Sequence, residues 1–154
     1  MTGTYTQLYI QLVFAVKHRD ARIKKEWQER LFSYIASIIE AKGNKSIIVN
    51  GVTDHVHIFI GLNPSVSISE LARDLKNNSS KFVNENKLSP SKFNWQEGYG
   101  AFSYSRSHID AVYNYILNQE EHHRKKTFKE EYIEFLKAFE IEYSDKYLFE
   151  WFED

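Results

Sequence analysis

The chain has 154 residues, enough for one domain with an ordinary core, and 42% of them are hydrophobic, which excludes a chain that is disordered overall. It has no cysteine, which excludes disulfide frameworks and thiolate zinc sites and suits a reducing cytoplasm. No apolar run approaches the ~18 residues of a membrane-spanning helix, and the N-terminus lacks a signal-peptide pattern, so we expect a cytoplasmic protein without a membrane partner.

The net charge of −1 hides an asymmetry along the chain. Residues 1–129 contain 18 Lys+Arg and 12 Asp+Glu, whereas residues 130–154 contain 2 and 9. A basic body attracts a polyanion, and an acidic C-terminal segment either shields it or packs on it. Two ordinary solvated faces would give the same composition, so the charge alone does not establish a nucleic-acid partner.

The first half of the chain predicts a strand, a helix and a hairpin. Aliphatic and aromatic residues predict a strand over 5–16, and an apolar stripe predicts a helix over 24–42 that ends at Gly43. A second strand is predicted over 45–52, and a tight turn leads from it into the histidine-bearing segment 54–60. We therefore expect these last two segments to pair as a hairpin.

The second half predicts three helices and one strand. Ser67 has capping-box spacing to a glutamate and starts a helix that extends to about residue 85. An aromatic strand is predicted over 93–105, with a bulge or bend at its two glycines. Two helices are predicted over 108–126 and 127–140, and an aromatic, acidic tail follows.

The order of these elements predicts the fold class. Two strand–helix–strand units around one sheet give an α+β, ferredoxin-like fold, an antiparallel sheet with helices packed on it, plus C-terminal helices. We expect residues 1–154 to form a single domain, with residues 128–154 as an acidic, aromatic extension that packs on or near it. This fold hosts nucleic-acid binders, enzymes and oligomerisation modules alike, so it does not choose a function.

The segment Asp54–Ile60 contains a pair of histidines with strand spacing. His55 and His57 point to one face of the strand, and the aliphatic residues between and after them point to the other. Two imidazoles held in this way can bind one metal ion or one phosphate, although a His-x-His pair alone is a weak motif and inert histidines would have the same spacing. Asp54 either forms the turn or orients an imidazole.

The predicted helix over 108–126 has a polar face that contains a hydroxyl and an amide. Tyr115 and Gln119 are four residues apart and are neighbours on this face. Tyr113 is the rival nucleophile, but it lies roughly 200° around the helix, on the apolar stripe. His122 and His123 either meet DNA or a metal, or are ordinary surface histidines. A hydroxyl nucleophile, two imidazoles and an oxygen ligand form a coherent catalytic set.

At these residues the chain resembles the single-tyrosine HUH transposases of the insertion-sequence-200 kind. The likeness extends from about residue 5 to 147 and includes Asp54–His57, the polar segment 75–82, the glycine-containing segment 95–103 and the tyrosine segment 112–128. The related transposases associated with repetitive extragenic palindromes (REP) form a branch that is often described as monomeric. The resemblance implies an RRM-like fold and an enzyme that cleaves and rejoins single-stranded DNA at hairpin-marked ends through a 5′-phosphotyrosine, without ATP.

The resemblance also implies the roles of individual residues. Tyr115 would be the nucleophile, and His55, His57 and Gln119 would be the metal ligands. Oxygen donors and phosphate favour Mg²⁺ or Mn²⁺, and two imidazoles also admit Zn²⁺, Co²⁺ or Ni²⁺. The implied assembly is a homodimer in a prokaryotic cytoplasm, nucleoid-associated when bound to DNA, in which Tyr115 of one chain serves the histidines of the other.

Cationic and short polar side chains are the candidates for contacts with the DNA backbone, although helix exteriors and solvated turns have the same composition. A non-catalytic or domesticated single-strand binder on the same fold is the alternative function, and an unrelated metal-dependent enzyme or structural protein is a third. The candidate DNA-binding residues are Lys17, Arg19, Arg22, Lys76, Asn77, Ser80, Lys81, Arg106, Arg124 and Lys125.

Overall fold

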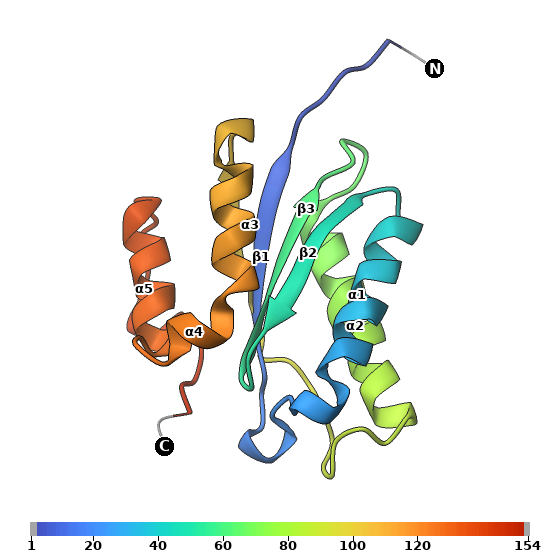
Figure 1. Ribbon diagram of the computed structural model, residues 1–154, viewed down its shortest axis with the longest axis vertical. Coiled ribbons are helices and arrows are strands. Elements are labelled where there is room, and N and C mark those ends of the chain that lie inside the picture. The colour runs from blue at the N-terminus through green and yellow to red at the C-terminus, as the bar shows by residue number, and fades with distance from the viewer. Residues whose placement is uncertain (1–2, 153–154) are drawn as a thin grey trace.

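The computed structural model, which describes residues 3–152, contains a four-stranded sheet with helices on both faces (Figure 1). The strands are β1 (Tyr9–Ala15), β2 (Lys45–Gly51), β3 (His55–Gly61) and β4 (Gly100–Tyr104). They lie in the order β2-β3-β1-β4, and every neighbouring pair is antiparallel. The predicted α+β, ferredoxin-like fold and the hairpin of β2 with β3 are confirmed.

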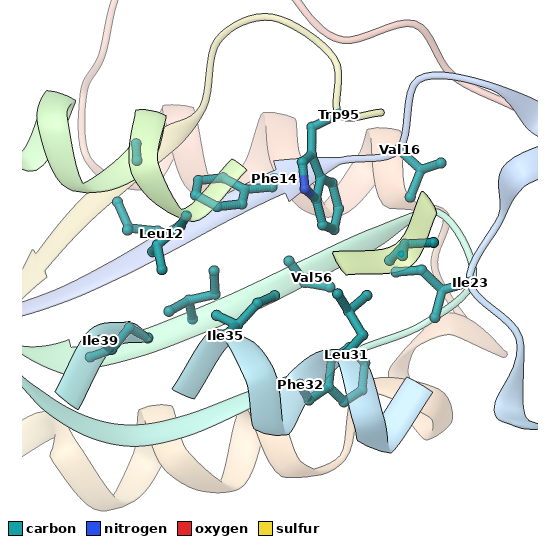
Figure 2. Close-up of a cluster of buried hydrophobic side chains, with 14 of the residues drawn as sticks. Leu12, Phe14, Val16, Ile23, Leu31, Phe32, Ile35, Ile39, Val56 and Trp95 are labelled. Carbon is teal, nitrogen blue, oxygen red and sulfur yellow. The ribbon is translucent and has the colours of Figure 1, made fainter. Parts of the chain in front are cut away.

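Two helices cover one face of the sheet, α1 (Lys25–Ala41) and α2 (Ile68–Glu85) (Figure 1). The main hydrophobic core lies between them and alternate residues of β1 and β3, for which Leu12 and Val56 are examples in Figure 2. Because side chains alternate along a strand, a core on this face sends His55 and His57 to the opposite face.

Three helices lie on that opposite face, α3 (Ile109–Leu117), α4 (Gln119–His123) and α5 (Phe128–Ala138) (Figure 1). A second core joins α5 to the sheet, with Tyr132 and Leu136 against Val13 and Phe102, and a third joins α3 to Phe59. Short 3-10 turns occur at Arg19–Ala21, Arg106–His108 and Asp145–Tyr147. Within residues 3–152, no helix is long and apolar enough to cross a membrane.

The strand predicted over 93–105 is much shorter in the structure. Only Gly100–Tyr104 pairs as β4, and Trp95 forms an isolated bridge to Val16. Between them, Gly98 takes a φ of +81°, and the Lys76 ammonium donates to the carbonyls of Gln96 and Gly98. The aromatic segment therefore bends before it pairs, and Lys76 ties down two carbonyls of the bend.

The helix predicted over 108–126 is divided at Asn118 into α3 and α4. Asn50 of β2 donates its side-chain amide to the carbonyls of Ile116 (2.8 Å) and Leu117 (3.2 Å). These carbonyls end α3 and need partners from outside the helix. The division follows from a tertiary contact with β2, and it changes the direction of the chain just before Gln119.

Candidate active site

Both histidines of β3 lie on the α3–α5 face, as predicted, and both are fully buried. Their rings are 5.0 Å apart between centroids and nearly perpendicular. His55 also stacks on the Phe128 ring at 3.8 Å with an interplanar angle of 1°. The pair is therefore held by packing within the molecule.

Each imidazole has its Nδ1 atom fixed by a neighbouring oxygen. His55 Nδ1 lies 2.8 Å from Asp54 Oδ1, and His57 Nδ1 lies 2.6 Å from Gln11 Oε1. Gln11 in turn donates to the Tyr104 hydroxyl at 2.8 Å. An oxygen on Nδ1 orients the ring and leaves Nε2 for a metal or an acid. Asp54 thus orients His55 as well as ending the turn, and Gln11 is a functional residue that the sequence reading missed.

Glu131 of α5 lies where the imidazoles converge. Its Oε1 atom is 3.2 Å from the Nε2 atoms of both His55 and His57 and 3.3 Å from His123 Nε2. The side chain is almost fully buried. The sequence reading missed Glu131 by placing it in an acidic extension. A signal was present, because it falls three residues after Phe128 and one before Tyr132 on the apolar stripe of the helix.

Tyr115 and Gln119 meet this carboxylate from the other side. The Tyr115 hydroxyl and the Gln119 amide, the latter at 3.1 Å, donate to Glu131 Oε2. Gln119 Oε1 also lies 3.3 Å from His55 Nε2. Tyr113 was expected on the core stripe, but it is 38% exposed. One chain therefore brings together its own Tyr115, Gln119 and histidine pair.

The buried charges shift one another. Burial alone would lower the pKa of His55, but hydrogen bonds to Asp54 and Glu131 outweigh it and raise the pKa to about 9. Burial lowers the pKa of His57, although Glu131 opposes the shift. Burial and the negative charge of Glu131 raise the pKa of Tyr115, so its hydroxyl stays protonated in this arrangement.

The donor set fits a divalent cation. One ligand atom from each of His55, His57 and Glu131 lies within 4.8 Å of the others. The separations of 3.2 Å join ligand atoms to one another, and they are close to the spacing of neighbouring ligands around one ion with bonds of ~2.1 Å. Imidazole with carboxylate and amide oxygen is a common ligand combination for such ions.

Comparison with known proteins identifies the family. Residues 4–119 match the family model described as transposase, IS200 like. This chain belongs to the IS200-like transposase family. The matched residues include the histidine pair, Tyr115 and Gln119 and end before Glu131, so the carboxylate of the site lies outside the matched segment.

Two solved structures share the fold of this transposase. A candidate transposase from Deinococcus radiodurans R1 is 22% identical, with a TM-score of 0.62 over 77% of this chain and 95% of that one. A REP-associated tyrosine transposase, solved bound to a REP hairpin, is 13% identical, with a TM-score of 0.58 over 80% of this chain and 73% of that one. No match was found among curated proteins.

The cationic residues predicted to bind DNA are spread over the transposase surface. Lys17 and Arg19 are exposed in the loop after β1, Asn77 and Lys81 are exposed on α2, and Arg106 is exposed in the turn before α3. Lys125 is exposed and lines a cavity of about 330 Å³ that also contains Tyr115. Only this last residue is placed beside the nucleophile.

Three other candidates are already engaged within the transposase, and a fourth has its hydroxyl buried. Arg22 donates to the Arg19 carbonyl, and Arg124 pairs with Glu121 at 3.1 Å. Lys76 is half-buried, tied to the bend before β4, and burial lowers its pKa to about 8. The Ser80 hydroxyl is buried without a hydrogen-bond partner among the described residues. Their contact with DNA stays a prediction.

Proposed function

We propose that this transposase cleaves and rejoins single-stranded DNA at hairpin-marked ends through a 5′-phosphotyrosine on Tyr115. The observation that carries the proposal is the link from the Tyr115 hydroxyl through Glu131 to the Nε2 atoms of His55 and His57. Its supports are the family match and the REP-associated structural relative, which was solved with a hairpin.

We assign a divalent cation to the histidine pair, with Glu131 and Gln119 as the oxygen donors. Mg²⁺ or Mn²⁺ suits the phosphate and oxygen ligands, and the two imidazoles also admit Zn²⁺, Co²⁺ or Ni²⁺. When bound, such an ion would polarise the scissile phosphate and neutralise part of its charge. Asp54 and Gln11 would keep the two Nε2 atoms directed at it.

The reaction itself needs only an attacking and a leaving oxygen. The bond from the Tyr115 oxygen to phosphorus forms while the bond from phosphorus to the 3′-oxygen breaks, and the proton lost by tyrosine balances the one gained by the 3′-hydroxyl. Glu131 and Gln119 hold the Tyr115 side chain beside the histidines, which are themselves buried. A 3′-hydroxyl of another strand reverses the step, so no ATP is consumed.

The site is complete within one chain, which differs from the shared arrangement that the resemblance suggests. Tyr115 lies 6.0 Å from its own His57 between ring centroids. We propose that this transposase uses its own tyrosine, and the homodimer stays a prediction.

The nucleophile is tested by removing one hydroxyl at a time. We expect Tyr115→Phe to abolish the covalent protein–DNA adduct and to leave hairpin binding nearly unchanged, because the substitution removes little volume. Tyr113→Phe is the matched control, since Tyr113 is two residues away and exposed, and it should form the adduct normally. A normal adduct from Tyr115→Phe, resolved by denaturing electrophoresis, would overturn the assignment, and a non-catalytic binder would form no adduct at all.

A further inference from the structure

A second cavity lies beside the active site and is lined by aromatic residues. Its volume is about 530 Å³. Its walls come from the β2–β3 turn at residues 52–54, the α4–α5 junction around Phe128 and the C-terminal residues Trp151 and Phe152. We call this space the aromatic cavity.

The aromatic cavity adjoins the proposed metal ligands directly. Asp54, in its wall, lies 2.8 Å from His55 Nδ1, and Phe128, in its wall, stacks on the His55 ring at 3.8 Å. His123 lines both the aromatic cavity and the cavity of about 330 Å³ that contains Tyr115. The two cavities therefore adjoin at His123. A DNA strand whose phosphate reaches Tyr115 can extend past His123 into the aromatic cavity.

The chemistry of the aromatic cavity suits a nucleobase. Trp151 and Phe152 are only partly buried, and the Trp151 ring is held edge-on by Phe128 at 5.2 Å. Lys129 is exposed at the rim, and the Arg19 guanidinium lies 5.8 Å from the centre of the Phe152 ring. Aromatic faces next to cations are how proteins bind single strands, because every base has a stacking surface and every nucleotide a phosphate.

We propose that the aromatic cavity binds an unpaired nucleobase next to the scissile phosphate, with Trp151 as the stacking partner and Lys129 as the phosphate contact. The inference rests on the proposed function, because it assigns a place to the strand that Tyr115 attacks. It also gives the C-terminal segment a part in binding the substrate.

Tryptophan fluorescence reports on this contact. The other two tryptophans, Trp27 and Trp95, are 6% and 4% exposed in the core, so a base that stacks in the aromatic cavity should quench Trp151 alone. We expect a short unstructured oligothymidylate to quench the wild-type emission and to leave the emission of Trp151→Phe unchanged. Equal quenching of both proteins would overturn the proposal.

Affinity gives the second measurement. Loss of one base–aromatic stack in Trp151→Ala should weaken oligothymidylate binding roughly 5- to 150-fold, and Trp151→Phe should retain most of the affinity. Tyr147→Ala is the control, because Tyr147 is an 80% exposed aromatic of the same segment that does not line the aromatic cavity. An equal loss of affinity in Tyr147→Ala and Trp151→Ala would contradict a specific stack on Trp151. So would an unchanged affinity in both variants.

A surface variant avoids the risk that Trp151→Ala loosens α5. Lys129→Glu changes an exposed side chain, and we expect it to weaken binding and to reduce the slope of log affinity against log salt by about 0.7. Lys137→Glu, an exposed position on the same helix, should leave both unchanged. Identical salt slopes for the two variants would overturn the phosphate contact.

Different results would overturn the proposed function and the proposed role of the aromatic cavity. A wild-type protein that neither binds nor cleaves single-stranded DNA would overturn the proposed function. A wild-type protein that forms the Tyr115 adduct, with no Trp151 quenching and normal affinity in the Trp151 and Lys129 variants, would overturn only the aromatic cavity.

Discussion

At the scale of single residues, the site depends on one carboxylate that joins the nucleophile to the histidines. Glu131 Oε1 faces His55 and His57, and Oε2 accepts from Tyr115 and Gln119. A buried carboxylate is costly unless its oxygens are satisfied, and here five side chains contact it, the fifth being His123. Because of these contacts, either Glu131 or Gln119 could be the stronger oxygen ligand of the proposed metal ion.

Metal affinity, measured in variants of Glu131 and Gln119, shows which of the two is the stronger ligand. Glu131→Gln keeps the shape of the side chain but removes its charge, so we expect Mn²⁺ affinity measured by calorimetry to fall by at least roughly 10- to 100-fold, the cost known for outer-shell partners. Gln119→Ala should have the smaller effect, because it removes a neutral donor. Glu134→Gln is the control for the loss of a nearby charge, because Glu134 is an exposed carboxylate of the same helix that lines the cavity containing Tyr115. An unchanged affinity in Glu131→Gln would mean that Glu131 is not a ligand.

The sequence predicted some residues of the site and missed others. His55 and His57 follow from strand spacing, which fixes the side chains that share a face. Helix spacing paired Tyr115 with Gln119, but the structure places them on α3 and α4, and they meet at Glu131. Glu131 and Gln11 come from elements that reach the site only through tertiary packing. No local spacing links Gln11 to His57, 46 residues away, although an acidic residue on an apolar stripe was visible at Glu131.

At the scale of elements, the break between α3 and α4 positions the catalytic side chains. Sequence periodicity predicted one continuous helix, since Asn118 has no strong breaking tendency. At the break, Asn50 of β2, a strand distant in sequence, donates to the last carbonyls of α3, and we infer that this contact favours the break. A similar distant contact, from Lys76 to the carbonyls near Gly98, shortens β4.

Removing this contact should destabilise the protein and misplace the site. Asn50→Ala removes the donor of two helix-end carbonyls, one part-buried and one exposed, so we expect a loss of about 1 kcal/mol, the net contribution of a typical hydrogen bond. We expect this loss in urea unfolding, together with a reduced rate of adduct formation. Asn114→Ala, at an exposed position of α3, should change neither by a comparable amount. Wild-type stability of Asn50→Ala would show that the break has another cause.

At the scale of the whole molecule, the fold separates packing from chemistry. The face of the sheet under α1 and α2 contains the main core, and the other face holds the histidines under α3, α4 and α5 (Figure 1). The acidic charge of residues 130–154 has no single role, because it includes the buried Glu131 as well as exposed carboxylates. The composition showed the charge asymmetry, but it could not tell which acidic residue is buried in the site and which ones are exposed.

Mixed chains test whether the site is self-contained. We expect Tyr115→Phe chains and His57→Ala chains each to be inactive, and a re-formed mixture of the two to stay inactive, since each Tyr115 lies beside the histidines of its own chain. A homodimer with shared sites would instead recover cleavage, because a mixed dimer would contain one intact site. Recovery in the mixture, with neither parent active, would contradict the self-contained site.

Tyr115 is the residue that we expect to form the covalent bond to DNA. Trapping the adduct on a single-stranded hairpin substrate, digesting the protein and sequencing the modified peptide by mass spectrometry locates that bond. We predict a nucleotide attached through its 5′-phosphate to Tyr115. Attachment to Tyr113 or to a side chain outside the site, or a cleaved strand with no attached peptide, would contradict the account.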